Sequence, residues 1–285
     1  MELSHAAPDR RPTDAEVDVH GLTHVGKVRQ ENQDHFQVIV VHKRATVIAS
    51  SLEDSAVALP PDQRLAAVAM VADGVASGDG GLASRLTVEL ATLYIAKVLE
   101  CFYGSDSHAA GFIEQLEGVV ARCHAEVVRR REAAGHRAAT TLTLWLGVWP
   151  SVFVVQVGDS RYYLYREGKL RQITRDQTVA QDLFDAGALT RTEAHRSPFA
   201  HILASAIGGE QAVPVVTQVH SEWGVVHLLC SDGLTKHVPD ERIAERLRTM
   251  TSAKQVAEAL LQDALDGGGS DNITIVVGRA VPRAG

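Results

Sequence analysis

The sequence predicts an α+β protein that combines antiparallel β-structure with two pairs of helices. Leucine and valine alternate with other residues over 142–148, which is the period of a strand with one buried face. Further short β-rich segments follow after tight turns, which favours antiparallel strands over parallel βαβ units. Apolar residues recur at helical spacing over 81–102 and 110–134. The sequence contains no glycine-rich loop with the spacing of a nucleotide- or dinucleotide-binding motif.

The first half of the chain contains three predicted strands and one helix pair. Residues 19–27 and 35–42 are β-rich segments on either side of a polar turn, and residues 65–72 are an apolar run typical of a buried strand. Residues 49–64 include two consecutive prolines and are expected to form a loop or irregular hairpin. The apolar stripes of the helices at 81–102 and 110–134 are expected to pack in the core.

The second half is expected to return to strands and end with a second helix pair. Strands are predicted at 142–148, 152–157, 162–165, 169–173, 213–219, 225–229 and 273–278. We expect 142–173 to form one antiparallel meander. Helices are predicted at 240–248 and 252–265, with Ser252 as the N-cap of the second and three glycines ending it. The polar segment 174–209 is expected to hold short helical pieces at 179–186 and 200–206.

Composition indicates a globular chain without a membrane-spanning segment. The 285 residues are 45% hydrophobic and 22% charged, with a net charge of −7, which argues against nucleic acid as the main partner. No apolar run approaches the roughly 20 residues of a transmembrane helix, and the polar N-terminus lacks the apolar core of a secretory signal. We expect a flexible tail at residues 1–18, a single domain at residues 19–285, a cytoplasmic location and no membrane partner.

Four aspartates stand at the ends of predicted strands. Asp34 and Asp271 precede strands, while Asp73 and Asp232 follow strands and are each followed by glycine. Taken singly, each is typical of a turn. If they converge, two carboxylates about 4 Å apart repel by about 4 kcal/mol at an effective dielectric near 20. Two divalent ions would neutralise four carboxylates, and ligands that are all oxygen favour Mg²⁺ or Mn²⁺. The spacing leaves open whether they converge.

Six short motifs lie in a fixed order over nearly the whole chain. They are Arg29 with Asn32-Gln33-Asp34, Val71-Ala72-Asp73-Gly74, Thr140-Thr141, Gly158-Asp159-Ser160-Arg161, Ser231-Asp232-Gly233-Leu234 and Asp271-Asn272. In this order they resemble the metal-dependent type 2C (PPM family) Ser/Thr protein phosphatases of bacteria. The resemblance implies a four-layer α-β-β-α sandwich, with a central antiparallel β-sandwich flanked by helix pairs.

The resemblance also implies a role for each matching residue. Asp73 would bridge two Mn²⁺ or Mg²⁺ ions, and the Gly74 carbonyl would bind one of them. Asp232 and Asp271 would hold the other ion. Asp34 would hydrogen-bond to metal-bound waters, and Arg29 would bind the substrate phosphate. The implied reaction is hydrolysis of phosphoserine or phosphothreonine by a metal-activated water, without a phosphoenzyme.

The chain departs from the family pattern at three positions. Gln33 stands where many members carry a metal-binding glutamate, so an oxygen donor is kept and a charge is lost. Val75 stands where animal members have a histidine proposed as general acid, so the leaving-group proton would come from elsewhere, such as a metal-bound water. His136 stands where relatives place an aspartate for a third ion. We therefore expect that ion to be weakly bound or absent, unless His136 is displaced by one loop residue. Asn272 is a secondary site residue.

Two classes of function remain open at this stage. The first is an active phosphatase that acts on phosphoproteins, works as a monomer and opposes a Ser/Thr kinase. The alternative is a catalytically inactive phosphatase-like module with a regulatory or binding role, and the complete set of matching residues favours activity. A two-metal nuclease fits the carboxylates but not the acidic charge balance. Residues 174–209 correspond to a variable flap beside the site, with Arg175 and Arg191 as candidate substrate contacts.

Overall fold

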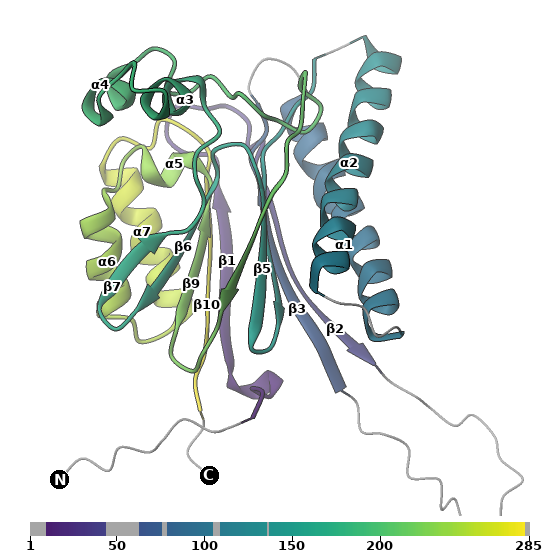
Figure 1. Ribbon diagram of the computed structural model, residues 1–285. Helices are drawn as coiled ribbons and strands as arrows, with labels where there is room; N and C mark the ends of the chain where they lie inside the picture. Colours follow the sequence, from purple (N-terminus) through teal and green to yellow (C-terminus); the bar gives the residue numbers. More distant parts are fainter. Residues whose placement is uncertain (1–9, 44–62, 76–78, 105–108, 136, 283–285) are drawn as a thin grey trace, which may run out of the picture.

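Two antiparallel sheets of five strands each lie face to face among the described residues (Figure 1). The computed structural model describes residues 10–43, 63–75, 79–104, 109–135 and 137–282. The first sheet contains, in spatial order, β1 (Val17–His24), β10 (Ile273–Ala280), β9 (Val226–Cys230), β6 (Arg161–Arg166) and β7 (Lys169–Gln172). The second contains β2 (His35–Lys43), β3 (Gln63–Ala72), β4 (Leu142–Val148), β5 (Ser151–Val157) and β8 (Val215–His220).

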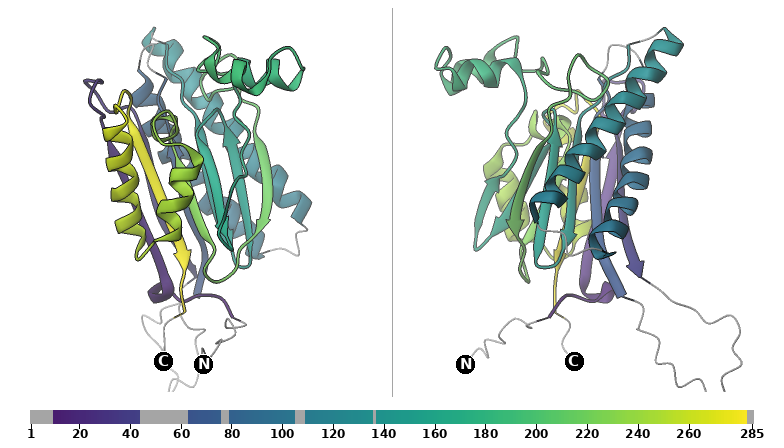
Figure 2. Two further views of the ribbon diagram at one scale, coloured as in Figure 1. Left: turned by 90° about the vertical axis from the view of Figure 1, so that its left-hand side faces the viewer. Right: turned by 45° about the vertical axis from the view of Figure 1, so that its right-hand side comes forward.

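Helices cover the outer face of each sheet. The second sheet is covered by α1 (Gly80–Gly104) and α2 (Ala109–Ala134), and the first by α6 (Asp240–Arg248) and α7 (Ala253–Asp266). Three shorter helices, α3 (Val179–Asp185), α4 (Arg191–Arg196) and α5 (Asp232–Thr235), lie at one end of the sandwich. Figure 2 shows the layers from two further sides. The expected four-layer α-β-β-α sandwich is therefore confirmed.

The β3 strand shows why the interior strands have continuous apolar sequences. Val68 and Met70 pack against α1 and α2, whereas Ala69 and Val71 face the space between the two sheets. Since successive side chains of a strand point to opposite faces, a strand covered on both faces needs apolar residues at every position. Each such side chain contributes about 1.5–3 kcal/mol when fully buried. The alternation seen over 142–148 therefore does not mean that one face of β4 meets solvent.

The expected meander over 142–173 is divided between the two sheets. The hairpin of β4 and β5 belongs to the second sheet, and the hairpin of β6 and β7 belongs to the first. Residues 158–160 connect them and cross the sandwich. The period of a strand is the same in either sheet, so the sequence pattern could not distinguish one meander from two hairpins.

Helix ends agree with the sequence where a capping signal was used. The Ser252 hydroxyl accepts a hydrogen bond from the Gln255 amide, which confirms Ser252 as the N-cap of α7. The helical piece expected at 200–206 was wrong: the helix lies at Arg191–Arg196 instead. Thr190 and Glu193 form a capping box there, and this Thr-x-x-Glu pattern was the stronger signal.

Part of the segment expected to be a flexible tail, residues 1–18, has regular structure. Asp14–Glu16 form a 3₁₀ turn, and β1 starts at Val17. Glu16 is buried and paired with Arg10 of the same segment, and Arg64 of β3 pairs with Asp14 at 2.9 Å, which ties the segment to the second sheet. Most of the loop expected at 49–64 lies outside the described residues. No described helix has both the length and the apolar character needed to span a bilayer.

Candidate metal centre

The four predicted aspartates lie at one end of the sandwich, three of them on loops and Asp232 as the first residue of α5. His35, the first residue of β2, pairs with Ala72, the last residue of β3, so Asp34 and Asp73 lie at the same end of these two strands. In the first sheet, Asp232 follows β9 and Asp271 precedes β10, and these two strands are also antiparallel neighbours. Antiparallel pairing therefore brings the start of one strand beside the end of the next in both sheets. This is the end where α3, α4 and α5 lie (Figure 1).

Asp73 is fixed by the two threonines that precede β4. The Asp73 carbonyl accepts hydrogen bonds from the Thr140 hydroxyl at 2.8 Å and from the Thr141 amide at 2.9 Å. The Asp73 amide donates to the Thr141 hydroxyl oxygen at 3.0 Å. These bonds hold the Asp73 backbone, and they explain why the Thr140-Thr141 motif accompanies this aspartate.

The electrostatics of Asp73 show that several carboxylates gather around it. Burial raises the pKa of Asp73 well above its usual range, and four neighbouring negative charges raise it further. Those charges belong to Asp34, Asp232, Asp159 and Asp271. The charges of all four aspartates that the sequence suggested, and that of Asp159, therefore act within one part of the structure.

Asp34 is buried with one of its oxygens unsatisfied. Its Oδ2 accepts hydrogen bonds from the Ser231 hydroxyl and the Thr274 hydroxyl, both at 2.7 Å. Its Oδ1 is buried and has no hydrogen-bond partner. Burial, with a smaller contribution from the charge of Asp232, raises the pKa of Asp34 to about 6. A buried carboxylate oxygen without a partner is costly unless a cation or an ordered water meets it.

Asp232 and Asp271 are paired with two cationic side chains. Lys236 Nζ lies 2.6 Å from Asp232 Oδ2 and 2.7 Å from Asp271 Oδ2. Arg29 forms a bidentate pair with Asp271, with Nε 2.7 Å from Oδ1 and a terminal nitrogen 2.9 Å from Oδ2. Although burial raises the pKa of Asp271, the hydrogen bonds from Arg29 and Lys236 lower it overall.

The carboxylates of Asp232 and Asp271 point toward these cationic side chains and do not form a ready metal-binding cluster. Within the described ranges, no three His, Cys, Asp or Glu side chains converge as a ready metal-binding cluster. The oxygens of Asp232 and Asp271 face ammonium and guanidinium groups instead. The donor set is nevertheless entirely oxygen, carries an excess of negative charge and includes the orphaned Asp34 Oδ1. Such a set fits hard divalent cations, provided that the paired side chains move aside.

Asn272 ties the loop that carries Arg29 and Asp34 to the start of β10. Its Oδ1 accepts from the Gln33 amide at 2.8 Å, and its Nδ2 donates to the Val25 and Glu31 carbonyls, both at 2.9 Å. Asn272 is 6% exposed, so these bonds are shielded from water. Its contacts are those of a positioning residue.

Two glycines at the centre are required by close packing. A Cβ at Gly74 would lie 2.5 Å from Gly80 C and 2.7 Å from the Gln33 carbonyl oxygen. A Cβ at Gly233 would lie 1.9 Å from the Asn272 carbonyl oxygen. No side chain fits at either position without movement of the backbone. The Asp-Gly pairs therefore allow chain segments to approach closely beside the carboxylates.

Sequence reasoning missed three contributors to this centre. Lys236 stands four residues after Asp232 on a helical turn, and that i,i+4 spacing was the available signal. Ser231 and Thr274 supply the hydroxyls that bind Asp34, and only the pairing of distant segments reveals them. His136, predicted to affect a third ion, lies outside the described residues.

The two flap arginines named above have different surroundings. Arg175 pairs with Asp182 at 2.8 Å and also contacts Asp185. Arg161 of β6 forms a bidentate pair with Asp176. Arg191 lines a polar cavity of about 270 Å³ between this segment and β6.

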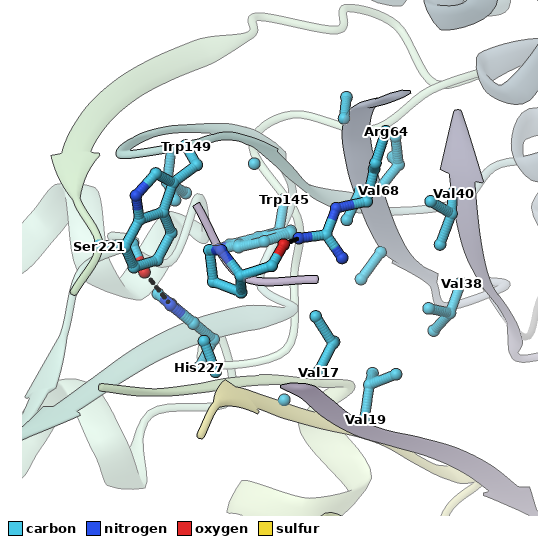
Figure 3. A pocket seen from close by; sticks show the side chains of 18 of the residues that line it. Val17, Val19, Val38, Val40, Arg64, Val68, Trp145, Trp149, Ser221 and His227 are labelled. Atoms are coloured by element: carbon cyan, nitrogen blue, oxygen red, sulfur yellow. Dashed lines mark hydrogen bonds between the residues drawn. The ribbon is translucent and has the colours of Figure 1, made fainter. Parts of the chain in front are cut away.

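A second cavity, of about 200 Å³, lies between the sheets near the opposite end of the sandwich (Figure 3). Valines of β1, β2 and β3 line it, together with Trp145 and Trp149. His227 at its edge bonds to Ser221 Oγ at 2.9 Å and to the Tyr162 hydroxyl at 2.8 Å. His227 is thus a buried residue with both ring nitrogens hydrogen-bonded.

Comparisons with known proteins agree with this geometry. A family model described as Protein phosphatase 2C matches residues 28–267. Over 241 residues the chain is 34% identical to the serine/threonine protein phosphatase PstP of Mycobacterium tuberculosis, covering 76% of this chain and 46% of PstP. It is 26% identical to the protein phosphatase PhpP of Streptococcus pneumoniae, over 92% of this chain and 96% of PhpP. The chain spans about half the length of PstP and of the Listeria monocytogenes phosphatase stp.

Solved structures give the same result for the fold. The crystal structure of M. tuberculosis PstP/Ppp superimposes with a TM-score of 0.71 at 28% identity, covering 93% of this chain and 99% of that one. The catalytic domain of PstP in complex with two manganese ions gives a TM-score of 0.70, also at 28% identity and with the same coverage. Staphylococcus aureus Stp1 shares the fold, with a TM-score of 0.75 at 20% identity over 99% of this chain and 100% of Stp1.

Proposed function

Because this chain belongs to the protein phosphatase 2C family, we propose that it hydrolyses phosphoserine and phosphothreonine in proteins with the help of two divalent metal ions. The observation that carries the proposal is that the charges of four other carboxylates, those of Asp34, Asp232, Asp159 and Asp271, act on Asp73. The PstP catalytic domain, a relative of the same fold, binds two manganese ions. Either Mn²⁺ or Mg²⁺ suits a donor set made only of oxygens.

We assign the metal-binding roles to the aspartates of this cluster. Asp73 would supply oxygen ligands to the ions, and the charges of Asp34, Asp232, Asp159 and Asp271 all act on it. The Gly74 carbonyl would help hold the first ion, and Asp232 with Asp271 would hold the second. Asp34 would accept hydrogen bonds from water near the ions through its free oxygen. The two ions, when bound, supply a nucleophilic water at neutral pH and offset charge on the phosphate.

The remaining residues bind the substrate and maintain the geometry. Arg29 is 41% exposed, so its guanidinium can reach a phosphate from solvent with charge-assisted hydrogen bonds. The hydrogen bond from the Gln33 amide to Asn272 holds in place the loop that carries Arg29 and Asp34. Gln33 and His136 remain secondary candidates, and a third ion stays doubtful.

The biological setting is also part of this proposal. Phosphoproteins are the expected substrates, and a Ser/Thr kinase is the expected opposing enzyme. A monomeric state and a cytoplasmic location remain predictions. The alternative of an inactive regulatory module is not favoured, because every proposed ligand is present in the sequence and the family model matches most of the chain.

Hydrolysis of para-nitrophenyl phosphate, followed by release of phosphate from a phosphothreonine peptide, tests the proposal. We expect activity with Mn²⁺ or Mg²⁺, loss of activity in EDTA, and a decrease of at least about 100-fold in Asp232→Asn. Asp266→Asn, at the exposed end of α7, is the matched control and should retain activity. A wild-type protein that stays inactive throughout Mn²⁺ and Mg²⁺ titrations would refute the proposal.

A further inference from the structure

A single lysine bridges the two aspartates that we assign to the second metal ion. Lys236 immediately follows α5, and its amide donates to the Asp232 carbonyl at 2.8 Å. Its side chain therefore turns back along the helix toward the carboxylates. Nζ lies 2.6 Å from Asp232 Oδ2 and 2.7 Å from Asp271 Oδ2. Both oxygens thus already have a cation.

The ammonium group and a metal ion require the same oxygens. A nitrogen within 2.7 Å of both oxygens fills the space between them. A divalent ion bound to the same pair at about 2.1 Å needs that space, and two cations so close would repel strongly. We propose that Lys236 is a built-in competitor for the second metal ion, which binds Asp232 and Asp271 only when it displaces the ammonium. This inference rests on the proposed function.

The surroundings of Lys236 make this competition effective. Its side chain is 23% exposed, and those of Asp232 and Asp271 are 17% and 18% exposed. The Lys236 ammonium lies between the two carboxylates and faces a negative charge on each side. A partly buried pair of this kind is screened by salt much less than an exposed one.

The competition falls on one of the two ions only. In the described part of the chain, no ion pair links Asp34 or Asp73 to a cationic side chain, whereas Asp271 is held by both Lys236 and Arg29. Two unequal binding steps follow. The first ion, held by Asp73 and the Gly74 carbonyl, would relieve repulsion without displacing an ion pair, while the second ion, which also needs Asp232 and Asp271, must break existing pairs. Lys236 therefore sets the metal concentration at which the centre is filled.

Isothermal titration calorimetry of metal-stripped protein with MnCl₂ tests this inference. Lys236→Met should tighten the weaker Mn²⁺ step by about tenfold at low ionic strength, because the ion then meets only the charge of Arg29 at Asp271 and no bound charge at Asp232. Lys236→Arg keeps a cation and should bind as weakly as wild type. Lys254→Met is the matched control: Lys254 forms another i,i+4 pair, with Glu258 at 3.8 Å on the exposed side of α7, and the variant should match wild type.

The thermal midpoint provides a second readout. In EDTA, Lys236→Met should unfold at a lower temperature than wild type, because Asp232 and Asp271 lose a counter-charge. Mn²⁺ should raise its midpoint by more than that of wild type. Lys236→Gln carries the test if the methionine variant does not fold.

The outcomes separate this inference from the proposed function. A wild-type affinity for both Mn²⁺ ions in Lys236→Met, or a weaker one, would overturn the role of Lys236 and leave the phosphatase proposal standing. Failure of the wild-type protein to bind any Mn²⁺ would overturn both.

Discussion

Replacement of Asp34 by asparagine should stabilise the metal-free protein at neutral pH. Burial raises the pKa of Asp34 from 3.8 to about 6. One pKa unit corresponds to about 1.4 kcal/mol, so ionising Asp34 in the folded protein costs about 3 kcal/mol relative to the unfolded chain. Asparagine keeps an oxygen that can accept from Ser231 and Thr274, but it carries no charge. The same change should abolish most of the activity.

The sign of this effect depends on pH. Because the folded pKa is raised, the stability that protonated Asp34 contributes is fully present below about pH 4 and is lost as the pH rises through 6. The difference in unfolding free energy between Asp34→Asn and wild type should therefore grow by about 3 kcal/mol between pH 4 and pH 8. Urea unfolding in EDTA, followed by tryptophan fluorescence, measures it.

Two comparisons make this experiment decisive. Asp266→Asn removes an exposed carboxylate at the end of α7 and should show no such growth with pH. Saturating Mn²⁺ should reduce or reverse the advantage of Asp34→Asn, because the ions stabilise only the protein that binds them. A stability difference that is flat with pH, or that favours wild type at pH 8 in EDTA, would refute the electrostatic account of this centre.

Three further substitutions test other parts of the structure. Gly233→Ala should lower the free energy of unfolding in urea by about 1–3 kcal/mol, since its Cβ would lie 1.9 Å from a backbone oxygen. Gly111→Ala is the control: its Cβ meets open space, so the free energy of unfolding should not fall. Asn272→Ala should lower the unfolding free energy by about 2–3 kcal/mol. It should also speed hydrogen exchange of the Gln33 amide, because that amide loses its acceptor. Unchanged exchange would contradict the positioning role of Asn272. Burial lowers the pKa of His227 to about 4, so the stability that it contributes is present above pH 6.5 and is lost as the pH falls toward 4. Between pH 6.5 and pH 4, the unfolding free energy of His227→Gln should fall by about 3 kcal/mol less than that of wild type. If both proteins unfold at the same acid pH, burial of neutral His227 does not contribute to the acid sensitivity.

The sequence was most informative where one physical rule decides the outcome. Helical periodicity located the two long helices, and capping chemistry located the start of α7 at Ser252. The aspartates at strand ends were visible because such positions are unusual unless a ligand or turn requires them. Antiparallel pairing then placed Asp34 beside Asp73, and Asp232 near Asp271.

The sequence was least informative where distant segments meet. Alternation cannot tell which sheet a hairpin joins, so the division of 142–173 was missed. The hydroxyls that bind Asp34 come from residues about 200 and 240 positions away along the chain. Lys236 has an ordinary helical spacing, and its importance appears only when Asp271 is seen on its other side.

The central claim is that the fold collects these aspartates to hold two divalent ions. A crystal structure of the protein soaked in MnCl₂, with anomalous diffraction data collected at the manganese edge, tests it most directly. We expect two anomalous peaks, both bonded to Asp73, with Asp232 and Asp271 on one of them and the Lys236 ammonium moved away. Manganese bound elsewhere, with Lys236 still joining Asp232 to Asp271, would contradict the account.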